Sequence, residues 1–127
     1  MDSLSLTVLP QAYAICQVQP GDPIPSQVFD ANFWSVTRTD TEISIVLPEK
    51  MVLPAWKVSS PWRCIKVEGP LDFSLIGILA GLSRTLAEAG VSLFALSTFE
   101  TDYLLVRAED LEKAKNALLA NGHRLMG

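Results

Sequence analysis

The side chains that could perform covalent chemistry are few and widely spaced in this chain. The two cysteines, Cys16 and Cys64, and the single histidine, His123, are of the types that most often act as nucleophile and base in enzymes. Cys64 and His123 form the one obvious pair, but neither lies in a motif with an acid that would orient the histidine. The sequence has no serine–histidine–aspartate arrangement, no zinc-ligand spacing and no phosphate-binding glycine loop. We therefore expect a protein that is not an enzyme and has no cofactor, no catalytic residue and no metal site.

Composition narrows the classes of partner. Hydrophobic residues make up 49% of the 127 residues, enough for a substantial core, and a formal net charge of -4 comes with 10 scattered lysines and arginines. Scattered positive charges offer phosphates no basic surface, so nucleic-acid binding is disfavoured. No apolar run approaches the roughly 20 residues that span a bilayer, and the first three residues lack the basic start of a signal peptide. We expect a cytoplasmic protein without membrane contact, in which Cys16 and Cys64 are buried free thiols because each lies in an apolar, strand-like segment.

The strongest local pattern lies between residues 65 and 106. The spacing predicts, in order, a strand at 65–67, a turn at 68–74, a helix that starts at Leu75, a strand at 91–98, a turn at 99–102 and a strand at 103–106. Within the helix, apolar side chains recur at the spacing of a helix that lies on a sheet: Ile78, Leu79, Leu82 and Leu86. Asp72 and Ser74 are the candidate N-caps, and Gly90 is the expected C-terminal stop.

A second helix and a last strand complete the pattern. Glu109 and Asp110 can cap a helix at 111–121 that Gly122 ends. The residues expected on its buried face are Leu111, Ala114, Leu118 and Leu119. Residues 124–126 would form the final strand, and His123 is expected at the surface near the helix end. The order of these elements is βαββαβ, so the expected fold class is α+β and ferredoxin-like.

The first half of the chain contains a second, weaker copy of this unit. Residues 4–19 read as a strand with an interruption at Pro10, and residues 33–46 read as a hairpin. A shift of 60 residues lays this hairpin on residues 93–106. The same shift pairs Pro10 with Pro70, Tyr13 with Phe73, Thr41 with Thr101, Glu42 with Asp102 and Glu49 with Glu109. One constant offset predicts two tandem repeats, at residues 1–60 and 61–127.

The two predicted copies differ in helix content. Pro20, Pro23 and Pro25 forbid a continuous helix where the second copy has its long one. Residues 51–58, in place of the second helix, are apolar but interrupted by a proline, so the first copy is expected to be degenerate and helix-poor. This segment carries Trp56 and leads to Trp62, and two interpretations stay open: core packing between the two copies, or a face for dimerisation.

Motifs in the second half resemble those of the ACT domain. They are residues 67–70 (Val-Glu-Gly-Pro), residues 77–79 (Gly-Ile-Leu) and residues 96–106, which contain the Ser-Thr-Phe-x-x-Asp turn. This set is similar to that of bacterial ACT proteins related to CASTOR-type arginine sensors and aspartate kinase regulatory domains. The resemblance is strong over residues 62–121 and weaker over residues 4–49, where the hairpin fits but the helices are missing.

The resemblance implies regulation and not catalysis. ACT domains pair side by side, and amino acids bind at the interface between paired domains, so an amino-acid ligand, a homodimer and a partner enzyme or regulator are implied. The backbone N–H groups at the helix start suit a carboxylate, and the carbonyls of Thr98 and Phe99 with the Asp102 carboxylate suit an ammonium group. The implied ligand-binding residues are Asp72, Phe73, Ser74, Leu75, Ile76, Gly77, Ile78, Ser97, Thr98, Phe99 and Asp102.

Several alternatives stay open from the sequence. Asp72 is either an N-cap or a ligand contact, and Asp102 either shapes its turn or contacts the ligand. Arginine sensors of this group carry an acidic residue where this chain has Leu75, so a smaller or more apolar amino acid is equally admissible. The competing function is a module that dimerises or docks on a partner protein without any small ligand. A ligand-binding protein gains stability with one particular amino acid, and a docking module does not.

Overall fold

The chain divides into two compact units in the computed structural model, which describes residues 3–69 and 76–127. The C-terminal unit consists of residues 1–10 and 63–127, and the N-terminal unit consists of residues 11–62. Two long strands, β1 (Ser5–Val18) and β4 (Lys57–Val67), each contribute one part to either unit. Residues 3–10 therefore group with the C-terminal unit, whereas the sequence placed them in the first repeat.

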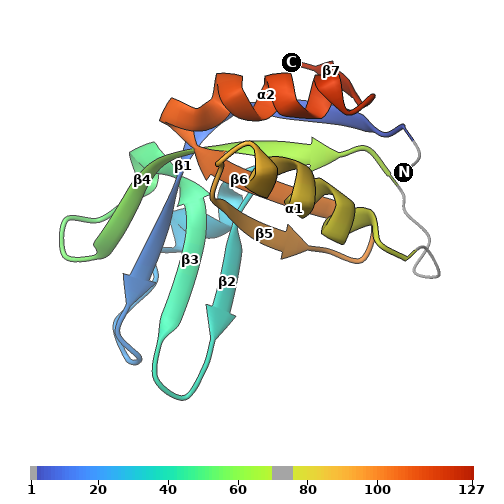
Figure 1. Ribbon diagram of the computed structural model, residues 1–127. Helices are drawn as coiled ribbons and strands as arrows, with labels where there is room; N and C mark the ends of the chain where they lie inside the picture. The colour runs from blue at the N-terminus through green and yellow to red at the C-terminus, as the bar shows by residue number, and fades with distance from the viewer. Residues whose placement is uncertain (1–2, 70–75) are drawn as a thin grey trace. The chain divides into compact units, whose positions relative to one another are not determined.

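The C-terminal unit has the expected ferredoxin-like order. After β4 come α1 (Ile78–Glu88), β5 (Leu93–Ser97), β6 (Asp102–Arg107), the short 3-10 turn η3 (Ala108–Asp110), α2 (Leu111–Ala120) and β7 (Arg124–Met126) (Figure 1). This β4-α1-β5-β6-α2-β7 succession confirms the α+β class and the βαββαβ order. Its strands are hydrogen-bonded in the order β1-β4-β6-β5.

The first part of β1 is what ties the N-terminal residues to this unit. Strand β7 runs parallel to β1, with Ser5 opposite Arg124, and β1 is also a neighbour of β4. Leu6 and Val8 are buried in the same hydrophobic cluster as the side chains of the C-terminal unit. Burial of these apolar side chains therefore places residues 5–10 in the C-terminal unit, a grouping that the local sequence pattern did not indicate.

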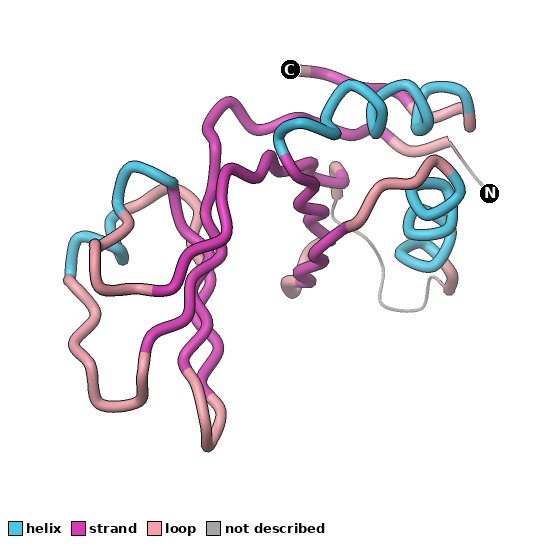
Figure 2. Tube along the Cα trace, turned by 60° about the vertical axis from the view of Figure 1, so that its left-hand side comes forward, coloured by secondary structure: helices cyan, strands magenta, loops and turns pink. Residues whose placement is uncertain are grey.

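Helices α1 and α2 cover the core of the C-terminal unit. They pack against one another, and Figure 2 shows the two helices, in cyan, beside the strands of this unit. Fully buried side chains come from both of them: Leu82, Leu86, Ala114 and Leu118. This confirms the predicted apolar stripe of the first helix. Leu119 was expected on the buried face of α2 but is 49% exposed, because consecutive helical residues point about 100° apart and Leu118 takes the inward direction.

Helix α1 begins later than the sequence predicted. Gly77 is its N-cap residue and has a φ of 85°, a left-handed conformation that cannot continue into an α-helix on its N-terminal side. The helix therefore starts at Ile78 and not at Leu75. The two expected caps, Asp72 and Ser74, fall among residues 70–75 and lie outside the described residues. At the other ends the predictions are confirmed: Gly90 and Gly122, with φ of 77° and 93°, follow the last turns of α1 and α2.

The N-terminal unit is a small antiparallel sheet with short 3-10 turns in place of helices. It contains η1 (Ser26–Asp30), β2 (Ser35–Arg38), β3 (Ile43–Pro48) and η2 (Glu49–Met51) besides its parts of β1 and β4. Its strands pair in the order β2-β3-β1. Residues 11–62 are all described and include no α-helix, which confirms the helix-poor first repeat. Strand β1 passes through Pro10 without a break, so the expected interruption was wrong.

This unit has a hydrophobic core of its own. Trp56 is 9% exposed and packs with Ala14, Ile45 and Leu47 in one cluster. Trp62 is also buried, and its indole Nε1 donates a hydrogen bond to Ser59 Oγ at 2.9 Å. Of the two interpretations of these tryptophans, burial favours packing in the core.

The internal repeat is present, with an offset of 59 residues in place of 60. The last pair of the β2–β3 hairpin is Arg38 with Ile43, and the last pair of β5–β6 is Ser97 with Asp102. The turns also match, because the Thr39 N–H donates to the Glu42 carbonyl at 2.9 Å and the Thr98 N–H donates to that of Thr101 at 2.8 Å. The pairing of Glu42 with Asp102 inferred from the sequence is therefore wrong by one residue, and Ile43 is the structural equivalent of Asp102.

Candidate functional site

The turn between β5 and β6 is closed by a threonine at each end. The Thr98 backbone N–H donates to the Thr101 carbonyl at 2.8 Å, and the Thr98 hydroxyl lies 3.2 Å from the same carbonyl. In return the Thr101 N–H donates to Thr98 Oγ1 at 3.3 Å. Side chain and backbone thus close the turn together, the arrangement by which threonine stabilises turns. The backbone of residues 99 and 100 is held at the tip.

Thr101 also fastens this turn to the end of β4. Its side chain is only 5% exposed, and Oγ1 donates to the Val67 carbonyl at 2.5 Å. Val67 is the last residue of β4 and is fully buried. From the sequence, Thr101 was noted only as the match of Thr41 in the first repeat, and its buried hydrogen bond to β4 was not predicted.

Asp102 faces Ser97 across the mouth of the same hairpin. The two residues are the last cross-strand pair, and Ser97 Oγ donates to Asp102 Oδ1 at 2.5 Å. Asp102 is partly exposed, so its carboxylate lies at the surface while one oxygen is held. It therefore shapes the hairpin and presents a negative charge, and the two readings of this residue are compatible.

The start of α1 is the second part of the candidate site. The first helical hydrogen bond runs from the Gly81 N–H to the Gly77 carbonyl at 2.9 Å, so the N–H groups of the first helical turn have no acceptor within the helix. Among the described residues no side chain caps this end. With the positive end of the helix dipole, these N–H groups attract an anion.

Strand β4 brings the two parts to one end of the C-terminal unit. It leads from Val67 toward α1, and Val67 accepts the bond from Thr101 in the β5–β6 turn. Figure 1 shows the start of α1 and the tip of the hairpin at this end. The N-terminus of α1 and the mouth of the β5–β6 hairpin therefore lie at the same end of the C-terminal unit.

The predicted site residues fall into three groups. Asp72, Phe73, Ser74 and Leu75 lie outside the described residues. Ile76, Gly77 and Ile78 stand at the start of α1, where Ile76 is 95% exposed and Ile78 packs against the core. Ser97, Thr98 and Asp102 are brought together at the hairpin, and Phe99 at its tip is 82% exposed.

The nucleophile and base candidates are all buried. Burial raises the pKa of the Cys16 thiol to about 11 and that of Cys64 to about 12, so both stay protonated at neutral pH. His123 was expected at the surface but is 3% exposed. Its Nδ1 accepts the Leu4 backbone N–H at 3.1 Å, and burial lowers its pKa. All three side chains therefore belong to the buried interior of the protein.

The described ranges 3–69 and 76–127 contain no group of three or more histidine, cysteine, aspartate or glutamate side chains that could hold a metal ion. Within the same ranges, no helix has the length and apolar character needed to cross a bilayer.

Comparison with known protein families matches the two halves of the chain to two different family models. A family model of the ACT domain matches residues 57–120. A separate model, of an N-terminal domain family, matches residues 11–56. The first repeat is thus recognised by a model of its own, which fits its divergence from the second.

Solved structures extend the similarity over nearly the whole chain. An Agobacterium tumefaciens protein is 35% identical, over 99% of this chain and 94% of that one, with a TM-score of 0.91. A Vibrio cholerae protein is 22% identical over 93% and 89% of the two chains, with a TM-score of 0.75. The regulatory subunit of aspartate kinase from Thermus flavus is 11% identical over 94% and 98%, with a TM-score of 0.67. Because the last two are only 22% and 11% identical to this chain, their similarity shows a common fold and nothing more.

Proposed function

Because this chain belongs to the ACT-domain family, we propose that it is a non-catalytic regulatory protein that binds a free amino acid in its C-terminal unit. The observation that carries the proposal is the fixed hairpin mouth, where Ser97 and the closed Thr98–Thr101 turn hold the Asp102 carboxylate at the end of the sheet from which α1 departs. Similarity to an aspartate kinase regulatory subunit supports the regulatory role.

In this proposal the ligand carboxylate binds the first N–H groups of α1. The N-terminus of an α-helix can bind a carboxylate without a positively charged side chain, because several backbone N–H groups and the helix dipole act together. Gly77 serves this end of the site through its backbone. Its φ of 85° turns the chain into the helix, and a Cβ there would meet no atom of residues 3–69 or 76–127 within 4 Å.

The ligand ammonium group binds at the hairpin. Asp102 supplies the negative charge, and the backbone carbonyls of Thr98 and Phe99 are the further acceptors. A charge-assisted hydrogen bond of this kind is worth about 1.5–3 kcal/mol when the site excludes water. The hydrogen bond from the Thr101 hydroxyl to the Val67 carbonyl fastens these acceptors to the end of β4.

Two copies of the chain complete the site. Ile76 lies beside the start of α1 and Phe99 at the tip of the hairpin; they are 95% and 82% exposed, so covering them with another molecule would remove apolar surface from water. A second C-terminal unit would shield both and enclose the ligand at the shared face. Ligand binding then favours one arrangement of the dimer, and a partner enzyme or regulator that distinguishes the arrangements reads the signal.

The experiment that tests the proposal is thermal unfolding against each common amino acid at millimolar concentration. A ligand present at about 100 times its Kd stabilises the protein by about 2.7 kcal/mol, which raises Tm by several degrees. Asp102→Ala is expected to abolish the response, and Asp40→Ala, in the equivalent turn of the first repeat, is the matched control. An unchanged Kd in Asp102→Ala removes that residue from the site.

Two further arms sharpen the outcome. The amide of the responding amino acid lacks the carboxylate and is expected to lose the stabilisation, which tests the α1 half separately. Light scattering with and without the ligand tests the dimer. If no amino acid changes Tm in a saturable way, the competing function stands: a module that docks on a partner without a small ligand.

A further inference from the structure

Two serine hydroxyls hold the side chain of Arg124 at the surface of the C-terminal unit. The Arg124 Nε and Nη2 both donate to Ser5 Oγ, at 3.1 and 2.9 Å, and Nη1 donates to Ser3 Oγ at 3.2 Å. Ser5 and Arg124 also lie opposite one another in the parallel pair of β1 and β7. Strand pairing and three side-chain hydrogen bonds therefore orient the guanidinium.

Neither serine neutralises the charge of this arginine. Within residues 3–69 and 76–127 the guanidinium forms no ion pair with a carboxylate. A guanidinium has five N–H donors, and three of them are used here, so two remain for another acceptor. The Ser5 hydroxyl accepts from Arg124, and in the described part of the chain it donates its own proton to no atom. The cluster is an oriented positive charge with three spare donors.

Glu68 is an acid on the strand beside Ser5, because its backbone N–H donates to the Ser5 carbonyl at 2.8 Å. Its carboxylate is engaged elsewhere: it accepts the Thr7 hydroxyl at 2.7 Å and lies 3.9 Å from Lys66 Nζ. Glu68 therefore leaves the charge of Arg124 unpaired.

The end of helix α2 does not use the spare donors either. Its last carbonyls accept the backbone N–H groups of residues 121–123, and the Gly122 carbonyl accepts the Ser3 hydroxyl at 2.6 Å. An arginine just after a helix can bond such carbonyls, but Arg124 donates to hydroxyls only. Its orientation therefore serves something other than the helix end.

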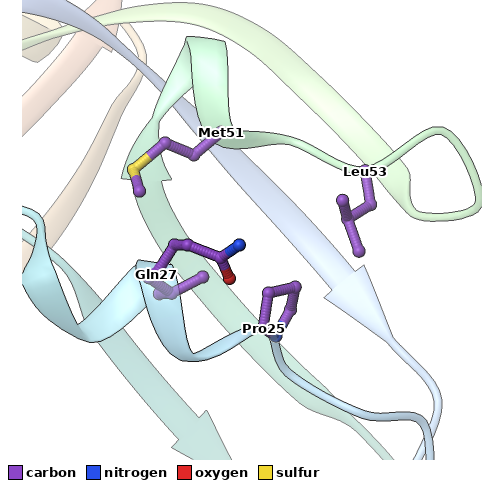
Figure 3. Close-up of a pocket in the computed structure, with 5 residues that line it drawn as sticks. Pro25, Gln27, Met51 and Leu53 are labelled. Carbon is purple, nitrogen blue, oxygen red and sulfur yellow. The ribbon is translucent and has the colours of Figure 1, made fainter.

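Two hollows of the N-terminal unit, each of about 230 Å³, differ from this cluster in charge. The hollow drawn in Figure 3 has no charged side chain among the described residues of its lining, which are Pro25, Gln27, Val28, Met51 and Leu53. The lining of the other includes both signs of charge, on Glu49 and Lys50. An anion therefore finds better donors at Arg124 than in either of these hollows.

We propose that Arg124 and Ser5 bind a terminal phosphate group of a small molecule. Two guanidinium N–H groups and one hydroxyl match in number the three terminal oxygens of a phosphate monoester, and an oriented guanidinium suits the geometry of phosphate. One fixed cation serves one phosphate group, whereas a nucleic-acid strand needs a row of cations. In the C-terminal unit β7 pairs with β1, and the β5–β6 hairpin lies on the far side of β4. The phosphate site is thus separate from the amino-acid site, and neither proposal depends on the other.

The test follows the Nε–H signal of Arg124 by NMR in the full chain labelled with ¹⁵N, and the loss of this signal in Arg124→Lys assigns it. The probes are inorganic phosphate and glycerol 3-phosphate at constant ionic strength, with chloride as the control anion. We expect a saturable shift with both phosphates, at millimolar concentrations because the site is exposed to water, and none with chloride. A lower Kd for glycerol 3-phosphate identifies a phosphorylated metabolite as the source of the phosphate group, and a lower Kd for inorganic phosphate identifies the free ion.

Paired variants locate the binding, with the Kd measured on the ³¹P signal of the phosphate. Arg124→Gln is expected to raise the Kd about tenfold, since it removes the charge-assisted hydrogen bonds. Arg84→Gln, at an exposed arginine of α1, removes the same charge elsewhere in the unit and should leave the Kd unchanged. Ser5→Ala is expected to raise the Kd about threefold and is the second variant in case Arg124→Gln loosens the pairing of β7.

Three results overturn the proposal: a shift of equal size with chloride, an equal loss of affinity in Arg84→Gln, or an unchanged Kd in both Arg124→Gln and Ser5→Ala. Arg124 then serves only to tie β7 to β1.

Discussion

Replacing Thr101 by valine tests how the candidate site is held in place. The two side chains have nearly the same shape, so the change removes the hydroxyl that donates to the Val67 carbonyl at 2.5 Å and leaves packing almost intact. Thr101 is 5% exposed and Val67 fully buried, so water cannot replace the lost donor. An unsatisfied buried carbonyl costs about 1–3 kcal/mol, and the methyl group gained on burial offsets about 0.8 kcal/mol.

The expected net loss for Thr101→Val is therefore about 0.2–2.2 kcal/mol. For a domain of this size a loss of 1 kcal/mol lowers Tm by roughly 3–5 °C, so a drop of about 1–11 °C is expected in a calorimetric scan. Thr101→Ser keeps the hydroxyl and loses one methyl group, so it separates the hydrogen bond from packing. If Thr101→Val has the same Tm as the wild type while Thr101→Ser has a lower Tm, the hydrogen bond to Val67 contributes nothing to stability. Its role in holding the turn is then refuted.

Two more changes test the packing and the pH response. Leu82→Ala removes a fully buried side chain of α1 and should cost about 2–5 kcal/mol in urea unfolding, whereas Leu119→Ala, at a half-exposed position of α2, should stay within about 0.5 kcal/mol of wild type; equal losses would show that the assigned helix faces are wrong. Burial lowers the pKa of His123 below its ordinary 6.5, so its stabilising contribution is complete above pH 6.5 and declines as the pH falls toward the folded-state pKa. Wild type should thus lose stability between pH 7.5 and 5 more steeply than His123→Gln, and parallel pH profiles would remove His123 from this role.

Local patterns predicted the elements whose causes are local. The stripe with Leu82 and Leu86 marks one face of a helix whatever the rest of the chain does. Gly90 and Gly122 take the left-handed φ that ends their helices because glycine adopts it without steric cost. The repeat was visible for the same reason, since each hairpin carries its own alternation and turn residues. The error of one residue in its offset arose because several like residues also align at 60.

Contacts between distant residues were beyond the same patterns. The sequence around Leu6 gives no indication that this residue lies opposite Leu125 of β7, because that pairing joins the two ends of the chain. His123 looked like a surface residue after a helix, but Gly122 reverses the chain and the imidazole then accepts the Leu4 N–H, 119 positions away. The hydrogen bond from the Thr101 hydroxyl to the Val67 carbonyl joins residues 34 positions apart, and the local pattern did not predict it either.

Alignment of the two repeats distinguishes the residues that stabilise the hairpin turn from the residues that are proposed to bind the ligand. The threonine that closes the turn is present in both, as Thr39 and Thr98. The pair at the hairpin mouth differs: Ser97 and Asp102 in the second copy correspond to Arg38 and Ile43 in the first, and Ile43 is 6% exposed. A buried isoleucine offers no carboxylate to an ammonium group, so the first copy keeps the fold of the site without its chemistry. The copy that lacks the carboxylate is also the copy in which residues 11–62 form no α-helix, so the two repeats have diverged both in their helices and in the side chains at the hairpin mouth.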